Sequence, residues 1–534
     1  MLSGTLETVA RTARALRVGE DMQRLGRLVR RTLRDDLEVP LPAGPPGPGS
    51  PLLGELLHAP DRDLDVALGA ALIAHEDAPE DVDLGRVLAE VDDLAAALRG
   101  RLEAVSRDDP AARLALTNRF FFEEQGFSAS PSRGARGSGE RLADLLLPWV
   151  LRRRRGHCVG LSTAYLAIGA RAGLPLFGVS APGHFFVRWD GEGHRQNVET
   201  TARGLAHPDE YYVQRFRIAP PLVDRGVYLQ NLRRRELLVE VLNNRANFYW
   251  DRGDEEHAAR DLDRVVQVSH NFARAYVGRG FMALVRGDLS AAQRELTRAL
   301  EIDPDLARAH LLLGEVHLRA GRLTDAELAL ERAAGDEQNA LALTGHGRLC
   351  LRRGQVEEAI RWHESALRTD PACHVAWNNL GVARQAKGDV AGARSAFRRA
   401  LALLPGFLPA RENLLLLGRQ GQGLSLLARP RAASIRRSYE QRLRRSPADD
   451  ELRASYVRFL LETSPDPERA LAVAREGEAS RPTVKNLESL AQALGRCGRR
   501  TEALTALERA LGVDAAAGGL EGPRLKRARE RLAQ

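Results

Sequence analysis

The chain is poor in cysteine, methionine and aromatic residues, and it has no long apolar run. Of its 534 residues, four are cysteine, three are methionine and 5% are aromatic. Four scattered cysteines cannot form a disulfide framework, and no Cys-X-X-Cys pair indicates zinc. No run of about 18 apolar residues is available to span a bilayer, and the first residues lack a signal-peptide core. We expect a cytoplasmic protein with no metal site and no cofactor.

Lysine is also scarce, occurring only at Lys387, Lys485 and Lys526, so arginine supplies almost all of the 79 basic residues. A net charge of +8 would favour nucleic acid if it were concentrated on one surface. The basic residues are instead interleaved with Asp and Glu, without the aromatic positions on which single strands stack. We expect neither nucleic acid nor membrane as a partner.

The length exceeds what one hydrophobic core usually organises, so we expect at least two domains. Residues 1–39 have the pattern of a basic amphipathic helical extension. The Pro/Gly-rich composition of residues 40–60 predicts a flexible linker. Apolar spacing from Asp61 to Leu102 then predicts helices.

A repeat with a period of 34 residues begins at about Val239. Small residues recur at three positions of each unit, where they let two helices approach closely. The pattern resembles the tetratricopeptide repeat and predicts an all-α superhelix over residues 239–417, whose groove takes a protein or peptide partner. The recurring residues are Ala246, Gly280, Gly314, Gly347 and Gly381; Ala258, Ala292, Ala326, Ala359 and Ala393; and Val265, Ala299, Ala333, Ala366 and Ala400.

The end of the chain repeats more weakly. Residues 451–517 contain two further repeat-like units, and residues 518–534 form a predicted helical tail. The Gly-, Gln- and Arg-rich start of residues 418–450 leaves two alternatives open, an irregular linker or a degenerate repeat. The sequence does not indicate an oligomeric state.

Cys158 stands directly ahead of an apolar, alanine-rich segment, Val159–Ala172, which ends at a Gly and a Pro. This places the thiol near the start of a predicted helix. Free backbone N–H groups, the helix dipole and the basic cluster of residues 152–155 would all stabilise a thiolate there. A buried, inert cysteine is the alternative interpretation for this residue type.

Two strand-like segments follow, His184–Trp189 and Arg195–Glu199, and the turn-rich stretch between them predicts a β-hairpin. If the turn is centred between residues 191 and 192, His184 lies directly opposite Glu199 on one face. A slip of one residue would move Glu199 to the other face. The order of thiol, imidazole and carboxylate is what an activated cysteine nucleophile requires.

On this hypothesis Cys158 is the nucleophile, His184 the general base and Glu199 the group that orients the imidazole. The backbone N–H of Cys158 is a candidate oxyanion donor. Asn197, two residues before Glu199 on the same face, is a weaker alternative for the orienting role. We expect His157 and His194 to be surface or supporting residues.

Four ordered motifs resemble bacterial transglutaminase-like proteins of the SirB type. The resemblance covers residues 61–235 and implies an α+β transglutaminase/papain-like domain with a helical N-terminal part, followed by the tetratricopeptide-repeat superhelix. It also implies a catalytic triad at Cys158, His184 and Glu199. The wider superfamily usually carries Asp where this chain has Glu199, and many SirB-type members lack the cysteine. The motifs are Leu116–Phe127, Arg154–Ser162, Gly173–Leu176 and Ala181–Arg188.

Two functions fit these features. The first is a cysteine-dependent acyl-transfer enzyme, a peptidase, amidase or transferase, whose repeats position a protein partner. The second is a non-catalytic scaffold or regulatory protein that uses both domains for protein binding. Relative thiol reactivity separates them, because only an active site requires Cys158 to react faster than Cys350, Cys373 and Cys497.

Overall fold

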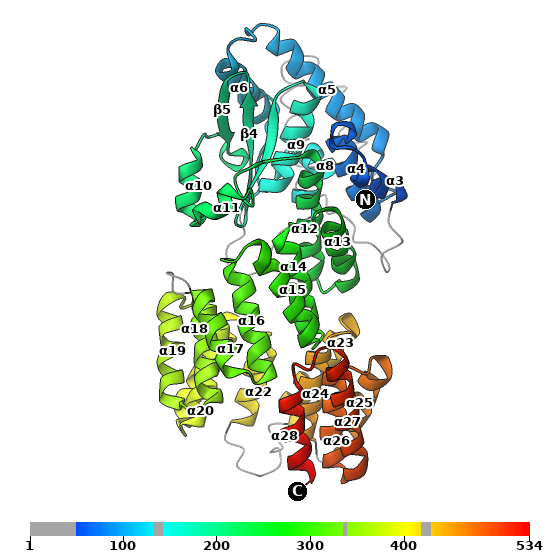
Figure 1. The fold of residues 1–534 in the computed structure, drawn as a ribbon, viewed down its shortest axis with the longest axis vertical. Helices are drawn as coiled ribbons and strands as arrows, with labels where there is room; N and C mark the ends of the chain where they lie inside the picture. Colours follow the sequence, from blue (N-terminus) through cyan, green and yellow to red (C-terminus); the bar gives the residue numbers. More distant parts are fainter. Residues whose placement is uncertain (1–49, 132–141, 335–338, 418–428, 465, 534) are drawn as a thin grey trace, which may run out of the picture. The chain divides into compact units, whose positions relative to one another are not determined.

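The computed structural model describes most of the chain (Figure 1). The predicted helical extension, residues 1–39, and the first part of the predicted linker lie outside the described residues. The described ranges are 50–131, 142–334, 339–417, 429–464 and 466–533.

The described residues form two compact units, and the boundary between them along the chain falls between about residues 252 and 271. The first unit includes α12 (Arg234–Asp251) and most of α13 (Glu255–Val268). The 34-residue pattern places these two helices in the repeats, which it predicts to start at residue 239. In the structure, the boundary between the two units comes after this helix pair. The fully buried Arg245 of α12 explains this, because it bonds both Asp261 of α13 and Asp77 of α4 (Val66–Asp77).

Among the described residues, the first helix of the first unit is α3 (Pro51–His58), inside the stretch expected to be a linker. Ser50 caps this helix by accepting a hydrogen bond from the Leu53 backbone, and a proline occupies its first turn. Leu53 and Leu57, one helical turn apart, are buried. The expected linker is therefore wrong for residues 51–58, because two leucines on one helix face outweigh the Pro/Gly-rich composition before them.

Helices then enclose a small sheet. Helix α9 (Cys158–Arg171) packs against α4, α5 (Leu84–Leu102) and α8 (Leu147–Arg153), and against the strands β3 (Leu176–Ala181) and β4 (His184–Gly191). The other strands of this sheet are β5 (His194–Val198) and β6 (Asn231–Leu232), and the antiparallel order is β5-β4-β3-β6. Two further short strands, β1 (Ser128–Ala129) and β2 (Arg155–Gly156), pair in parallel with each other. Figure 1 shows β4 and β5 side by side, with α9 next to them.

The two faces of the sheet are covered by different elements. Phe185 contacts Gly178 on the face that meets Leu166 of α9. On the opposite face Val179 and Phe186 share a core with Tyr212 and Leu222, which belong to α10 (Asp209–Phe216) and α11 (Pro220–Asp224). Side chains of alternating positions on β4 therefore enter two different cores, as a strand buried on both faces requires.

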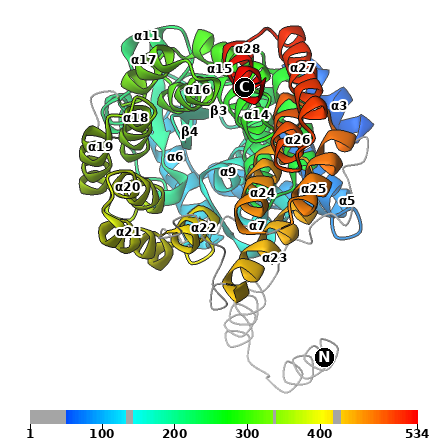
Figure 2. The ribbon, with the colours of Figure 1, turned by 90° about the horizontal axis from the view of Figure 1, so that it is seen from below.

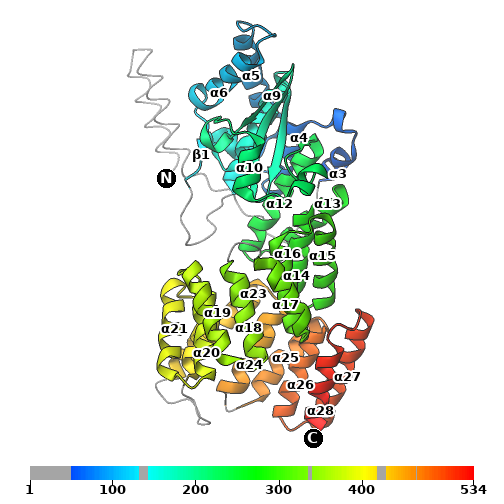
Figure 3. The same cartoon turned by 60° about the vertical axis from the view of Figure 1, so that its left-hand side comes forward.

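The second unit consists entirely of helices among its described residues. Consecutive helices pair antiparallel, and Figure 3 shows the pairs stacked side by side. This confirms the predicted all-α repeat architecture. The first array comprises α14 (Ala273–Val285), α15 (Leu289–Ile302), α16 (Ala307–Ala320), α17 (Leu323–Ala334), α18 (Ala340–Arg352), α19 (Val356–Thr369), α20 (His374–Ala386), α21 (Val390–Leu403) and α22 (Leu408–Leu416).

The recurring small residues lie where the helices of a pair touch. Ala292, Ala326, Ala359 and Ala393 are all fully buried. A Cβ on the glycine position would meet the partner helix closely: at Gly280 it would lie 2.7 Å from the Leu296 side chain. The 34-residue pattern thus reflects steric demand at each helix crossing.

The chain continues in α23 (Arg429–Arg445), α24 (Asp450–Thr463), α25 (Glu468–Ser480), α26 (Val484–Arg496), α27 (Arg500–Ala516) and α28 (Gly522–Ala533). Much of the region left open as linker or degenerate repeat is therefore the helix α23. Within this unit Leu520 joins the core of the first array with Leu284 and Leu289. Figure 2 shows the C-terminal helices α24–α27 on one side of this unit and α18–α21 on the other.

None of the described helices combines the length and apolar content that crossing a membrane requires.

Candidate thiol site

Cys158 is the first residue of α9, and two glycines near it allow the chain to pass close to α7 (Leu142–Leu145). The His157 backbone donates to the Asp144 carbonyl over 3.0 Å. A Cβ at Gly160 would lie 2.2 Å from that carbonyl oxygen, and one at Gly156 2.9 Å from it. The Gly-His-Cys-Val-Gly run is therefore needed to seat the thiol at the start of the helix.

His184 and Glu199 are direct hydrogen-bond partners, with 2.6 Å between His184 Nε2 and Glu199 Oε2. The second carboxylate oxygen accepts from the Thr201 hydroxyl over 2.8 Å. The Glu199 backbone donates to Leu205 over 2.9 Å, which fixes the chain directly after β5. Both carboxylate oxygens are thus occupied, and Nδ1 remains as the ring nitrogen available to the thiol.

The predicted hairpin register is wrong by two residues. Gly191 pairs with His194, so the turn consists of Glu192 and Gly193, both with positive φ, 57° and 73°. Such a two-residue turn matches the right-handed twist of the strands. Because side chains alternate with a period of two, the displacement keeps Glu199 on the face of His184 as a diagonal neighbour.

The charges at the site favour a thiolate and an imidazolium. Burial alone would raise the pKa of Cys158, but hydrogen bonds and charge from His157 and His184 lower it to about 6. Burial also opposes charge on His184, yet hydrogen bonds to Cys158 and Glu199 raise its pKa to about 9. Burial opposes charge on Glu199 as well, but His184 and Thr201 hold its pKa below the usual value. The two shifts together favour the thiolate–imidazolium form of the pair near neutral pH.

His157 acts on the thiol more directly than its sequence position suggests. Among the interactions that lower the pKa of Cys158, the hydrogen bond with His157 has the largest effect. The clue in the sequence was adjacency to the cysteine, but adjacency does not reveal where a side chain points before the helix start is known.

Aromatic rings of α10 also lie next to the imidazole, which the sequence did not indicate. The Phe216 ring is 5.6 Å from the His184 ring at an interplanar angle of 20°. Tyr212 stacks on Phe186 with 4.0 Å between centroids. These rings make one side of the site apolar.

The alternative residues lie elsewhere. Asn197 accepts a 2.7 Å hydrogen bond from the buried Arg188 and donates to Asp209, so it belongs to a network behind the site. His194 lies beside the hairpin turn, at the opposite end of β4 from His184. The structure does not bring either residue to the imidazole.

The other cysteines have a different environment. Cys350 and Cys373 are buried, and Cys497 is partly exposed. Burial raises the pKa of all three thiols, whereas that of Cys158 is lowered. Within the described residues, no group of His, Cys, Asp and Glu side chains is placed to hold a metal ion.

Comparisons with known families agree with this architecture. Residues 85–243 match the transglutaminase-like superfamily, and residues 283–349 and 344–406 match the tetratricopeptide repeat. The chain therefore carries a transglutaminase-like domain followed by tetratricopeptide repeats, an arrangement capable of protein interaction.

Individual relatives cover parts of the chain. A UPF0162 protein of Xylella fastidiosa (strain 9a5c) is 28% identical over 255 residues, which are 44% of this chain and 82% of the relative. A TPR repeat-containing protein of Pseudomonas aeruginosa is 42% identical over 64 residues, 12% of this chain and 61% of the relative.

Solved structures are similar at lower identity. PilW, described as a widely conserved type IV pilus biogenesis factor, is 16% identical with a TM-score of 0.31, covering 41% of this chain and 98% of its own. YrrB, described as a TPR protein with an unusual peptide-binding site, is 23% identical with a TM-score of 0.25, covering 32% of this chain and 88% of its own.

Proposed function

We propose that the protein is a cysteine-dependent acyl-transfer enzyme whose repeats bind a protein partner. The observation that carries this proposal is the chain of contacts from Cys158 through His184 to Glu199. The fold of the first unit and the order of its motifs support the finer assignment to the SirB type. A nucleophile of this kind must remain reduced, which favours the cytoplasm.

The reaction follows from the charges. The Cys158 thiolate attacks an amide or ester carbonyl, and the backbone N–H groups at the start of α9 face the developing oxyanion. The His184 imidazolium then gives its proton to the leaving amine or alcohol as the C–N or C–O bond breaks. The acyl-enzyme is resolved by water or an amine, whose proton passes back to His184.

Glu199 acts through the imidazole. Its hydrogen bond to Nε2 holds the ring and leaves Nδ1 as the nitrogen that can serve the thiol, and its negative charge stabilises the imidazolium. Replacement of the superfamily's usual Asp by Glu lengthens the side chain, and the diagonal position of Glu199 across the hairpin accommodates that length.

A burst experiment tests acyl-enzyme formation. With p-nitrophenyl acetate, we expect one equivalent of p-nitrophenol per enzyme before a slower steady phase, and an acetyl adduct on Cys158 by mass spectrometry. Cys158→Ala should abolish the burst, and His184→Ala should slow it about 10²–10⁴-fold. Cys497→Ala is the matched control and should retain the full burst.

The scaffold alternative predicts another result. If wild type and Cys158→Ala release p-nitrophenol alike and no adduct forms on Cys158, the domain is a binding module and the enzyme proposal is wrong.

A further inference from the structure

A cationic cavity of about 300 Å³ lies within the second unit, where the C-terminal helices meet the first array. Glu315 and Arg319 of α16 and Arg348 and Arg352 of α18 form one wall. The other wall comes from Glu451 of α24, Lys485 of α26, and Glu521 and Arg524 around the start of α28. Segments more than a hundred residues apart in sequence thus build one site.

The lining carries more positive than negative charge. Five cations, Arg319, Arg348, Arg352, Lys485 and Arg524, face three carboxylates, Glu315, Glu451 and Glu521. Glu521 is paired with Arg524, a cation of the same lining. Arg524 is also paired with Glu488, outside the lining. An anion would enter a site whose net charge favours it.

Ion pairs hold most of these cations in place. Arg319 lies 2.6 Å from Glu315 and 2.9 Å from Glu451, and Lys485 lies 3.0 Å from Glu451. Arg348 is paired with the same Glu315 carboxylate. Guanidinium groups fixed in this way lose little freedom when they bind a planar carboxylate.

Arg352 is the exception among the five cations. It is exposed and makes no hydrogen bond or ion pair within the described part of the chain. It also occupies the same repeat position as Arg319, because each follows its unit's small glycine, Gly347 or Gly314, by five residues. A cation with free donors at the edge of the cavity is ready to pair with a ligand.

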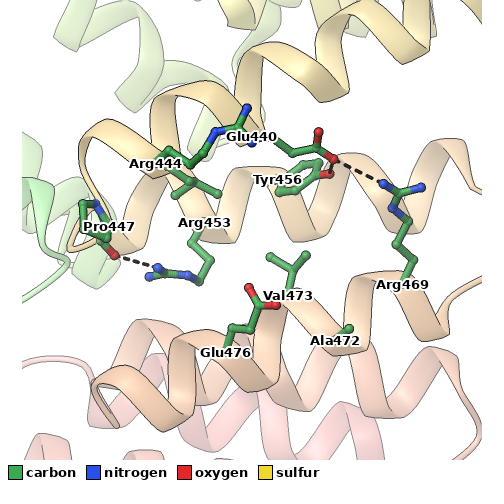
Figure 4. A pocket seen from close by; sticks show the side chains of 10 residues that line it. Glu440, Arg444, Pro447, Arg453, Tyr456, Arg469, Ala472, Val473 and Glu476 are labelled. Carbon is green, nitrogen blue, oxygen red and sulfur yellow. Dashed lines mark hydrogen bonds and ion pairs between the residues drawn. The ribbon is translucent and has the colours of Figure 1, made fainter.

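A larger cavity of about 580 Å³ between α23, α24 and α25 has a smaller excess of positive charge (Figure 4). Its Glu440 accepts a 2.8 Å hydrogen bond from Tyr456 and lies 3.2 Å from Arg469. Val473 and Ala472 add an apolar floor. Three arginines there face two glutamates, so it selects a charge less strongly.

We propose that the cationic cavity binds the carboxylates of an acidic peptide segment of a protein partner. The volume is at the lower end for ligand pockets and suits one or two acidic side chains rather than a whole folded surface. Carboxylates match the paired N–H donors of arginine in shape as well as charge. This deepens the partner-binding part of the proposed function and is independent of the thiol chemistry.

Fluorescence anisotropy with fluorescein-labelled hexaglutamate and the full chain tests the proposal. We expect saturable binding that weakens with salt, with hexalysine not binding. Arg352→Glu should weaken hexaglutamate binding at least tenfold. Arg361→Glu is the matched control: its side chain on α19 is 71% exposed and outside the cavity, so affinity should stay within about twofold.

Equal affinity of Arg352→Glu and Arg361→Glu, or no binding of hexaglutamate to wild type, would overturn the proposal. Displacement by tripolyphosphate at far lower concentration than by unlabelled hexaglutamate would assign the cavity to phosphate groups and also overturn it. Cys158→Ser should bind like wild type, so failure of the enzyme proposal is distinguishable from failure of this one.

Discussion

At the scale of residues, the described repeats contain one position that departs from the pattern. Leu296, Leu330 and Phe397 pack against the glycines of their units, Gly280, Gly314 and Gly381. The unit formed by α18 and α19 places His363 against Gly347 instead. The His363 side chain is fully buried, and neither ring nitrogen has a hydrogen-bond partner within the described residues.

We predict that His363→Leu stabilises the protein. Removing unpaired buried polar atoms should raise the free energy of unfolding at pH 7 by about 1–3 kcal/mol. Chemical denaturation followed by circular dichroism measures this change. Leu330→His is the reverse control and should destabilise by a similar amount; a less stable His363→Leu would contradict the argument.

His363 also makes the stability of the protein depend on pH. Burial first, and then the charge of Arg348, lower the pKa of His363 to about 4 from 6.5. The folded state therefore binds the proton less readily than the unfolded chain. Stability from this residue is complete above about pH 6.5 and falls by about 3 kcal/mol towards pH 4. This part of the pH dependence should disappear in His363→Leu.

At the scale of elements, the sequence predicted the repeats well because each helix crossing demands a small residue at a fixed interval. It predicted the position of Cys158 at a helix start for a similar reason, since the Gly and Pro after α9 are strong stop signals. It failed on the register of the β4–β5 hairpin. The turn-favouring residues between the two strands indicated that a turn exists. Only the positive φ of Glu192 and Gly193 shows where this turn is centred.

The sequence also did not predict which residues surround the site, namely His157, Phe216 and Tyr212. Their contacts with the site depend on how α10 packs over the sheet and on the direction of a side chain just before α9. Neither leaves a periodic signal in the sequence. Period and spacing therefore predict elements and their order, whereas the surroundings of a reactive group depend on tertiary packing.

At the scale of the molecule, the first unit is completed by α12 and α13. A Cβ at Gly69 of α4 would lie 2.3 Å from the Leu238 side chain of α12, so these helices interlock. Arg245 lies 2.9 Å from Glu76, 3.2 Å from Asp77 and 2.6 Å from Asp261. Without α12, Glu76 and Asp77 would be buried carboxylates that have lost their central cation.

We predict that a fragment of residues 50–270 folds and that one of residues 50–235 does not. The longer fragment should melt cooperatively in circular dichroism, and the shorter one should lack a cooperative transition because it has lost Arg245 and Leu238. Cooperative melting of both fragments at similar temperatures would show that α12 and α13 are dispensable to the first unit.

The most direct test of the central claim is the pH dependence of iodoacetamide alkylation at each cysteine, resolved by peptide mass spectrometry. Cys158 should react with a half-maximum near pH 6 and, at pH 7, at least tenfold faster than the partly exposed Cys497. Glu199→Gln should move this half-maximum upward, because the imidazolium loses its partner. A half-maximum near the ordinary thiol value of about 8.5, with Cys158 no faster than Cys497, would contradict the account of an activated cysteine.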